Sequence, residues 1–183
     1  METDVQSRVQ WIIDPIHSEI AFKVRHLMIT TVKGVFQKYY ASIATTGEDF
    51  TTAQIDFWMD PDSVDTGDNT RDNHIRSADF FDIENHKHIT FTNAFIESVD
   101  NDGSYELYGD LTIKGITKKI TLDVEFGGVI KDPWGNTKAG CTINGKINRK
   151  DWELNWNTPL EAGGVLLGND VRISCEVQVI KQN

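Results

Sequence analysis

Hydrophobic and polar residues alternate with a period of two along much of the chain. In the segment 19–26, for example, Ile20, Phe22 and Val24 alternate with Lys23 and other polar or small residues. Successive side chains of a β-strand point to opposite faces, so this alternation is typical of a half-buried strand with one polar face. The same pattern predicts strands in the segments 19–26, 53–59, 107–113, 120–126 and 171–179.

Short segments rich in Gly, Asp and Asn separate these strands and predict turns between sequential, hairpin-paired neighbours. The main interruption runs from about residue 62 to 81, where Asp68, Asn69 and Thr70 can cap a short helix. We expect this helix to continue through His74 and Ile75 towards two phenylalanines. The turn segments are 46–49, 100–103, 114–115 and 132–136, and a second irregular stretch covers about 155–168.

About eight or nine strands and one helix in a single domain must close into a barrel or pair as a sandwich, because open sheet edges are a liability. The sequential meander favours an antiparallel barrel. An eight-stranded barrel has an interior just wide enough for side chains or for one small ligand. The alternation by itself is compatible with either interior.

Composition limits the partners of this 183-residue chain. Its formal net charge of −10 argues against binding to nucleic acid and against general adhesion to anionic lipid surfaces. It does not bear on an uncharged hydrophobic ligand. No stretch approaches the ~18 apolar residues of a membrane span. The N-terminal residues 1–4 show no secretory signal, so we expect a cytoplasmic location, or a periplasmic one if a signal has been removed.

Motifs for metal, phosphate or nucleophilic chemistry are missing or incomplete. His86-x-His88 could place two rings on one strand face, but no further zinc ligand stands nearby in the sequence. The acidic run 60–68 does not satisfy the calcium-loop pattern, whether the twelve-residue loop is counted from Asp60 or from Asp62. Cys141 and Cys175 do not form a Cys-x-x-Cys pair, and the apolar alternation around them favours buried free thiols. We therefore expect no cofactor and no metal.

Several blocks, in order along the chain, together resemble the YceI-like family from about Trp11 to Val179. The resemblance departs from the family pattern at Lys87, where Pro is common, and at Glu153, where Gly is usual. The blocks are Trp11-Ile12-Ile13-Asp14-Pro15-Ile16-His17-Ser18, Val32-Lys33-Gly34-Val35-Phe36, Asp79-Phe80-Phe81, Ile89-Thr90-Phe91, Gly109-Asp110-Leu111-Thr112-Ile113-Lys114-Gly115, and Asn148-Arg149-Lys150-Asp151-Trp152 followed by Leu167-Gly168-Asn169-Asp170-Val171.

The resemblance implies an all-β fold, an antiparallel eight-stranded lipocalin-like barrel with one short helix inserted. Residues 11–183 would form this single domain, and residues 1–10 an N-terminal extension. It also implies a non-catalytic carrier whose interior holds a polyisoprenoid or an isoprenoid quinone. The partner would then be a hydrophobic small molecule, with no nucleic acid and no membrane-spanning segment.

The candidate ligand-binding residues are those expected to face the interior or to close one end of the barrel. Two other functions remain open: an enzyme acting on a quinone or isoprenoid, with His26 or His74 as proton donor, and a structural or partner-binding barrel with a filled core. The sequence also leaves open whether two barrels pair as a homodimer. The candidates are Phe22, Val24, Phe36, Ile55, Phe57, Phe91 and Leu111 on strands, Ile75, Phe80 and Phe81 near the helix, Trp152, Trp156 and Leu166 in the late segment, and the polar residues His26 and Arg149.

Overall fold

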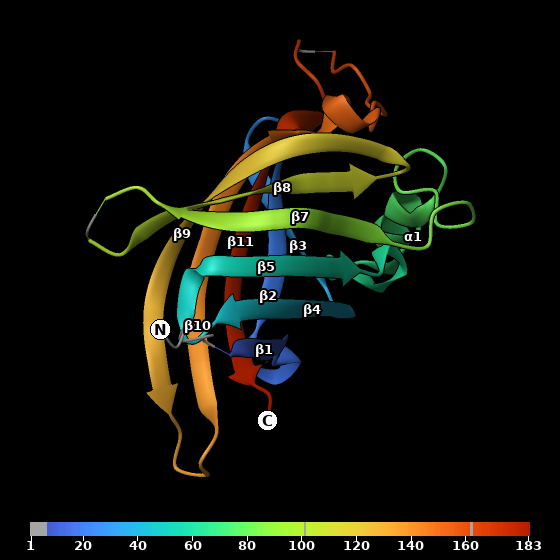
Figure 1. Ribbon diagram of the computed structural model, residues 1–183. Helices are drawn as coiled ribbons and strands as arrows, with labels where there is room; N and C mark the ends of the chain where they lie inside the picture. The colour runs from blue at the N-terminus through green and yellow to red at the C-terminus, as the bar shows by residue number, and fades with distance from the viewer. Residues whose placement is uncertain (1–6, 101, 162) are drawn as a thin grey trace.

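The fold is an antiparallel β-barrel with one α-helix beside one of its ends (Figure 1). The computed structural model describes residues 7–100, 102–161 and 163–183. Within them the strands are β1 (Arg8–Ile13), β2 (Glu19–His26), β3 (Thr30–Phe36), β4 (Tyr39–Thr46), β5 (Asp49–Met59), β6 (Val64–Asp65), β7 (Ile89–Ser98), β8 (Ser104–Ile113), β9 (Ile116–Lys131), β10 (Thr137–Asn148) and β11 (Leu167–Lys181).

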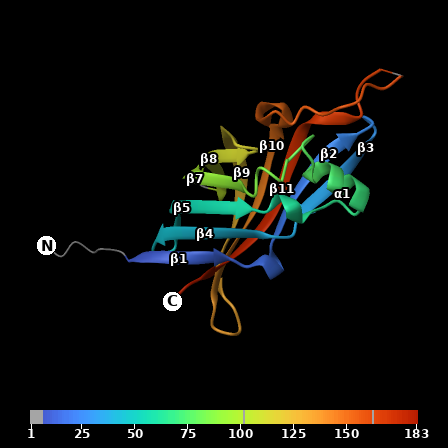
Figure 2. The same ribbon diagram turned by 90° about the vertical axis from the view of Figure 1, so that its right-hand side faces the viewer.

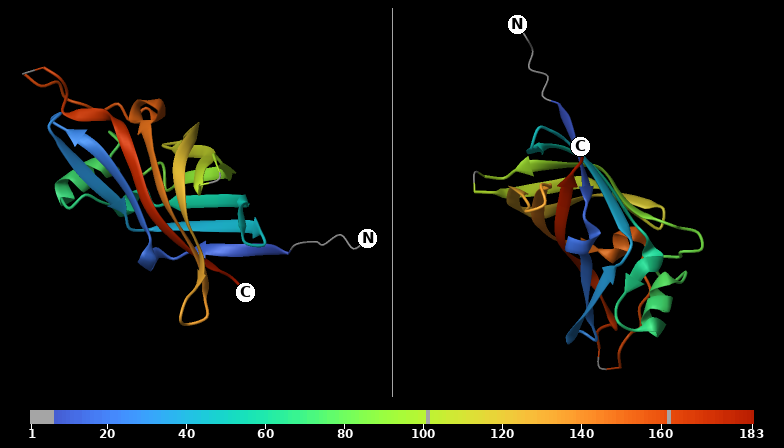
Figure 3. Two further views of the ribbon diagram at one scale, coloured as in Figure 1. Left: turned by 90° about the vertical axis from the view of Figure 1, so that its left-hand side faces the viewer. Right: turned by 90° about the horizontal axis from the view of Figure 1, so that it is seen from below.

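Eight strands form a closed ring in the order β1-β4-β5-β7-β8-β9-β10-β11, and β11 pairs back to β1. The closing ladder joins Ile13 to Val179, so the first and last strands lie side by side (Figure 3). The expected eight-stranded antiparallel barrel is therefore confirmed. The ring leaves no open edge between its strands, which removes the template for edge-to-edge pairing.

Three further strands, β2, β3 and β6, extend β1, β4 and β5 of this ring, and each is separated from its ring strand by a short interruption. β2 pairs with β11 and β3, and β3 pairs with β6, in the same lateral order as β1, β4 and β5. The short 3-10 segments Pro15–His17 and Pro61–Ser63 lie in two of the three breaks. Proline at the start of each segment has no N–H to give to a strand ladder, so the pairing stops there.

The predicted period of two describes the barrel wall well. β2 begins at Glu19 and ends at His26, as expected, and the other four predicted strands lie within β5, β8, β9 and β11. Along β11, Val171, Ile173 and Cys175 face the interior, while Arg172 is exposed. β1 begins at Arg8, so three residues of the expected N-terminal extension belong to the barrel; residues 1–6 lie outside the described residues.

Helix α1 (Asn69–Arg76) starts where the sequence predicts and ends earlier than expected. The Asp68 side chain accepts a hydrogen bond from the Arg71 N–H at 2.8 Å, which is the expected N-cap. The helix ends because Ser77 adopts an extended conformation and its N–H bonds to the carbonyl of His74. The expected continuation towards Phe80 and Phe81 was wrong: both lie in the turns after the helix.

One end of the barrel is packed by aromatic side chains, and we call it the closed end. Trp11 is fully buried, and its indole N–H donates to the Thr45 hydroxyl at 2.8 Å. The ring of Phe50 lies 4.9 Å from that of Trp11 and 5.1 Å from that of Phe126. Three different strands, β1, β5 and β9, thus meet through their side chains at this end.

Candidate functional site

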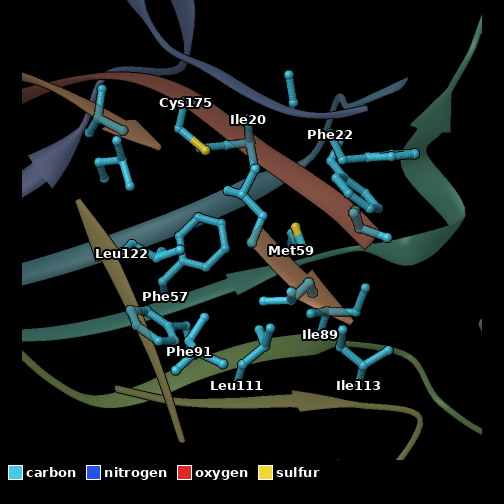
Figure 4. Close-up of a pocket in the computed structure, with 18 of the residues that line it drawn as sticks. Ile20, Phe22, Phe57, Met59, Ile89, Phe91, Leu111, Ile113, Leu122 and Cys175 are labelled. Carbon is cyan, nitrogen blue, oxygen red and sulfur yellow. The ribbon is translucent and has the colours of Figure 1, made fainter. Parts of the chain in front are cut away.

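The barrel interior is hollow. It encloses a cavity of about 760 Å³ whose wall consists mainly of aliphatic and aromatic side chains from all around the ring. Figure 4 shows such side chains from several strands pointing into the shared space, including Phe57, Phe91, Leu111 and Leu122. A core filled with side chains would leave no cavity of this size between the strands. A barrel filled with side chains is thereby ruled out.

Two glycines give room to aromatic rings on the cavity wall. An added Cβ at Gly34 would lie 2.3 Å from the Phe22 ring, and one at Gly109 would lie 2.4 Å from the Phe91 ring. Each ring therefore lies flat against the backbone of a neighbouring strand. A side chain at either glycine would push the ring into the cavity and reduce the space there.

Fourteen of the fifteen predicted candidates line the cavity. The exception is Trp152, which is 1% exposed and packs behind the wall, where its indole N–H donates to the carbonyl of Leu111 at 3.0 Å. Its position follows from the 3-10 helix η3 (Arg149–Trp152) that ends β10. The lining candidates are Phe22, Val24, His26, Phe36, Ile55, Phe57, Ile75, Phe80, Phe81, Phe91, Leu111, Arg149, Trp156 and Leu166. That they contact a ligand stays a prediction.

The cavity reaches solvent beside the first turn of α1, and we call this region the mouth. Among the described lining residues, the exposed ones are Asp68, Thr70 and Arg71. Arg71 is fixed by hydrogen bonds from its guanidinium to the hydroxyl and the carbonyl of Thr66, at 2.6 and 2.7 Å. The polar groups of the cavity thus gather at its opening, and the deeper wall is apolar.

An aromatic cluster borders the mouth. The ring of His74 lies edge-on to Trp156, with centroids 4.5 Å apart, and 5.1 Å from the ring of Phe80. His74 also hydrogen-bonds through Nε2 to Asp79 at 2.9 Å. Figure 2 shows α1 and the segment before β11 at the same end of the barrel as the β2–β3 hairpin. The mouth is therefore built from connections, whereas the closed end is built from strands.

Arg149 holds the late segment against the barrel. It is 2% exposed, and its guanidinium donates to the carbonyls of Leu154, Trp156, Leu167 and Gly168. Burial lowers the pKa of this guanidinium from its usual value. The side chain lines the cavity, but its donors are used by the backbone. Arg149 therefore has a structural role in holding the segment from Leu154 to Gly168 in place.

Both cysteines are free thiols that line the cavity. Burial, then the neighbouring Cys175 and Glu176, raise the pKa of Cys141 to about 12, and mainly burial raises the pKa of Cys175 to about 11. Reactivity of a thiol depends on its thiolate form, so both groups act as small apolar side chains in this cavity.

The candidate set missed the inner faces of β9, β10 and β11 and the polar residues of the mouth. Ala139, Cys141, Ile143 and Ile147 alternate with polar residues, which is the signal that could have found the β10 wall. A bulge between Gly140 and Cys141 interrupts that strand's pairing with β9. For Thr66, Asp68 and Arg71 the sequence carries no such signal, because only the packing of α1 brings them to the opening.

Nothing in the described part of the chain forms a metal centre or a membrane-spanning helix. There, no three His, Cys, Asp or Glu side chains lie close enough together to hold a metal ion. The two histidines of the His86-x-His88 pair make different contacts: His86 lies 4.0 Å from Asp82, and His88 packs on the ring of Trp58. The one α-helix is too short and too polar to cross a bilayer.

Fold and cavity together define a lipocalin-like barrel with a hollow apolar interior. The chain belongs to the YceI-like family, because the YceI-like domain model matches residues 11–179. A UPF0312 protein of Staphylococcus aureus is 40% identical over 167 residues, which cover 90% of this chain and 94% of the relative. A UPF0312 protein of Staphylococcus epidermidis is 39% identical over 166 residues, with the same coverage of the two chains.

Solved structures share this fold. The YCEI protein of Campylobacter jejuni is 34% identical, with a TM-score of 0.74 over 87% of this chain and 90% of that one. BcnA of Burkholderia cenocepacia is 19% identical, with a TM-score of 0.76 over 91% and 98%. A domain of Saccharophagus degradans described as polyisoprenoid-binding is 14% identical, with a TM-score of 0.66 over 94% and 98%. At these last two identities the likeness concerns the fold alone.

Proposed function

We propose that this protein is a non-catalytic carrier that holds a polyisoprenoid chain, such as the tail of an isoprenoid quinone, inside its barrel. The observation that carries the proposal is the apolar cavity of about 760 Å³ with its polar groups confined to the mouth. Such a volume is within the range of roughly 300–1,000 Å³ typical of small-molecule sites. The description of the Saccharophagus degradans domain as polyisoprenoid-binding agrees with it.

Burial of hydrocarbon supplies the affinity in this proposal. Each CH₂ group moved from water into an apolar interior gains roughly 0.8 kcal/mol, so about twenty carbons outweigh an association cost of about 4–15 kcal/mol. A bilayer interior is equally apolar, so the gain relative to a membrane is small. The protein would therefore exchange its ligand with membranes and would not trap it permanently.

The tail would occupy the deep wall, and a more polar head group would lie at the mouth. There, the guanidinium of Arg71 offers hydrogen-bond donors, and the rings of His74, Phe80 and Trp156 border the opening. A quinone carbonyl is an acceptor that suits such donors. Burial of the tail requires no specific polar contact, so the fit of the tail alone sets most of the affinity.

The first test is to identify what copurifies with the protein. We expect mass spectrometry of an organic extract to show a polyprenyl compound or an isoprenoid quinone. Added isoprenoid quinone should raise the melting temperature of delipidated protein, because a ligand that binds only the folded state stabilises it. An extract without lipid, together with no thermal shift, would remove the basis of the proposal.

A pair of tryptophan substitutions on β10 tests the cavity itself. Ile143→Trp fills the interior, because Ile143 lines the cavity, whereas Asn144→Trp places the same ring on the exposed outer face. We expect the inward variant to lose most of the copurifying lipid and the outward variant to keep it. Equal lipid content in two folded variants would contradict binding inside the barrel.

The enzyme alternative makes a different prediction at the mouth. His74, bonded to Asp79, and His26 both line the cavity and are the available proton donors. For a carrier, the double variant His26→Ala/His74→Ala should retain lipid of the same mass as the unchanged protein. If the unchanged protein turns over a quinone or isoprenoid and the double variant does not, the result would instead favour the enzyme.

A further inference from the structure

Four basic residues lie side by side on the outer face of the barrel, one on each of four neighbouring strands. The register pairs Lys146 of β10 with Arg172 of β11, Arg172 with Lys23 of β2, and Lys23 with Lys33 of β3. All four side chains are exposed. We call these four residues the basic row.

Such a row costs stability, since like charges directly opposite each other on neighbouring strands repel. Glu19 lies 2.6 Å from Lys33, and Asp170 lies 3.7 Å from Lys146. For Lys23 and Arg172 no ion pair is formed with any residue that the structure describes. Open positive charge concentrated on a protein of net charge −10 indicates a surface for an anionic partner.

The tip of the β2–β3 hairpin is apolar and exposed. Leu27, Met28 and Ile29 are 38%, 50% and 72% exposed. Leu27 and Met28 have φ values of 54° and 62°, in the left-handed region that Gly and Asn adopt most readily. Large L-residues there strain the backbone. Apolar side chains are thus exposed to solvent at this turn although the backbone conformation there is unfavourable for them.

The hairpin tip lies beside the mouth of the cavity. The Leu27 N–H donates to the carbonyl of Leu166 at 2.8 Å, and both Leu166 and His26 line the cavity. The Arg25 guanidinium donates to the carbonyl of Met28 at 2.9 Å, so a cation stands directly behind the apolar tip. The opening, the apolar tip and the Arg25 cation therefore belong to one end of the barrel. Figure 2 shows the β2–β3 hairpin at that end.

The spacing of these features matches the layers of a membrane surface. Because a strand rises about 3.3 Å per residue, Arg25 lies about 7 Å and the basic row about 13 Å behind Leu27 along the strand. The head-group layer on each side of a bilayer is roughly 5–8 Å thick. With the tip at the acyl boundary, Arg25 would lie among phosphates and the basic row within about one Debye length of them.

We propose that this end of the barrel docks on an anionic phospholipid bilayer, with Leu27, Met28 and Ile29 in the interface and Arg25 and the basic row facing lipid phosphates. The surface goes beyond the carrier function, but its use for loading rests on that proposed function. A mouth placed on the bilayer lets an apolar tail move into the cavity without exposure to water. The overall acidity then limits adhesion to this one orientation.

Flotation with lipid vesicles tests the docking directly. We expect the full-length protein to float with vesicles of phosphatidylcholine mixed with phosphatidylglycerol at low ionic strength. Vesicles of pure phosphatidylcholine, or high salt, should retain much less protein, because salt screens the attraction. Equal flotation with both vesicle types would overturn the electrostatic part of the proposal.

Two sets of variants separate the basic row from the tip. Lys23→Gln/Arg172→Gln should raise the apparent Kd for anionic vesicles by about 20-fold, since each basic residue near such a surface contributes substantially to binding. Leu27→Asn/Met28→Gly supplies the preferred turn residues, so it should raise the denaturation midpoint and still weaken vesicle binding. A role of the tip in folding alone would move stability without moving vesicle binding.

Matched controls alter the far end of the molecule. Arg8→Gln/Lys131→Gln makes the same change in net charge, and Trp134→Asp removes a side chain that is 81% exposed at the β9–β10 turn. Neither should affect flotation, and a loss with either would overturn the assigned orientation. Tighter binding of polyglutamate than of anionic vesicles would instead show that the row fits an acidic protein.

The lipid content of the same preparations keeps the two proposals apart. Vesicle binding by a protein that never carries an isoprenoid would leave the docking surface standing and reject the carrier function. Isoprenoid-loaded protein that does not bind anionic vesicles would support the carrier function and reject the docking surface.

Discussion

The two ends of the barrel are built in different ways. At the closed end, strands β1, β5 and β9 bring Trp11, Phe50 and Phe126 together, and the buried indole N–H finds its partner on β4. At the mouth, a helix, a hairpin tip and the segment before β11 supply the residues, and Glu153 and Met28 adopt left-handed backbone. Aromatic side chains from the strands thus pack together at one end, and the interior is accessible at the other.

The difference teaches that stability and binding can be separated within one barrel. Ladder hydrogen bonds and fully buried side chains give the closed end its share of the free energy of unfolding. The residues at the opening itself, such as Asp68 and Arg71, are exposed, although Val64 and Arg149 nearby are buried, so a change among the exposed residues should affect ligand exchange more than folding.

The largest expected effect comes from removing the buried tryptophan at the closed end. Trp11→Ala should lower the free energy of unfolding by about 3–5 kcal/mol, because it leaves a cavity and removes the hydrogen bond that the indole N–H donates to the Thr45 hydroxyl. Chemical denaturation measures this loss. The matched variant Trp156→Ala at the half-buried mouth should cost roughly half as much and release more lipid. The opposite ranking in either measurement would contradict the separation of the two ends.

A smaller effect concerns the carboxyl of Asp14, which follows β1 and accepts hydrogen bonds from the Ile16 N–H and the His17 ring. Burial raises the pKa of Asp14, but these bonds and the charge of Lys138 outweigh it, so the pKa lies below the usual 3.8. The resulting stability is present above that usual value and is lost as the pH falls through the lowered one.

Asp14→Asn should therefore reduce the free energy of unfolding by about 1 kcal/mol at neutral pH and by less at pH values below the lowered pKa. Denaturation curves at several acidic pH values measure the difference between the two proteins. A difference that stays constant with pH would show that the carboxylate charge contributes nothing. Asp151→Asn makes the same carboxyl-to-amide change at an exposed residue and serves as the control.

The last prediction concerns the chemical reactivity of the two thiols in the cavity and involves no change in stability. Because the pKa of Cys141 is raised to about 12 from an ordinary 9.0, its thiolate fraction at neutral pH falls about a thousandfold. Alkylation of the native protein should therefore be far slower than that of the unfolded chain. Removal of lipid should speed it modestly by opening access, and rapid native alkylation would contradict burial of the thiols.

The sequence predicts the wall of the barrel better than its openings. Alternation identifies the inner faces of β2 and β11 because one side chain in two must meet the interior. The same alternation is compatible with a filled barrel, so the hollow interior depends on how residues such as Phe22 lie over Gly34. The departure from the family pattern at Glu153, where Gly is usual, falls at a residue with a φ of 57°, a left-handed conformation that glycine adopts most readily.

Features that join distant parts of the chain could not be predicted. The basic row brings Lys23 beside Arg172, and only the register of β2 and β11 reveals it. Likewise, Arg149 binds four carbonyls of a segment that has no periodic pattern. Trp152 belongs to a motif of the family resemblance, yet η3 turns it behind the wall.

The pairing of the first strand with the last has a consequence for synthesis. The ring closes when Ile13 meets Val179, so nearly the whole chain must leave the ribosome before the final ladder forms. Contacts so far apart in sequence carry a high loop-closure entropy and form slowly. Until the ring closes, the apolar side chains of the barrel wall are exposed and can associate with other chains. Repulsion between nascent chains of net charge −10 would protect them during this interval.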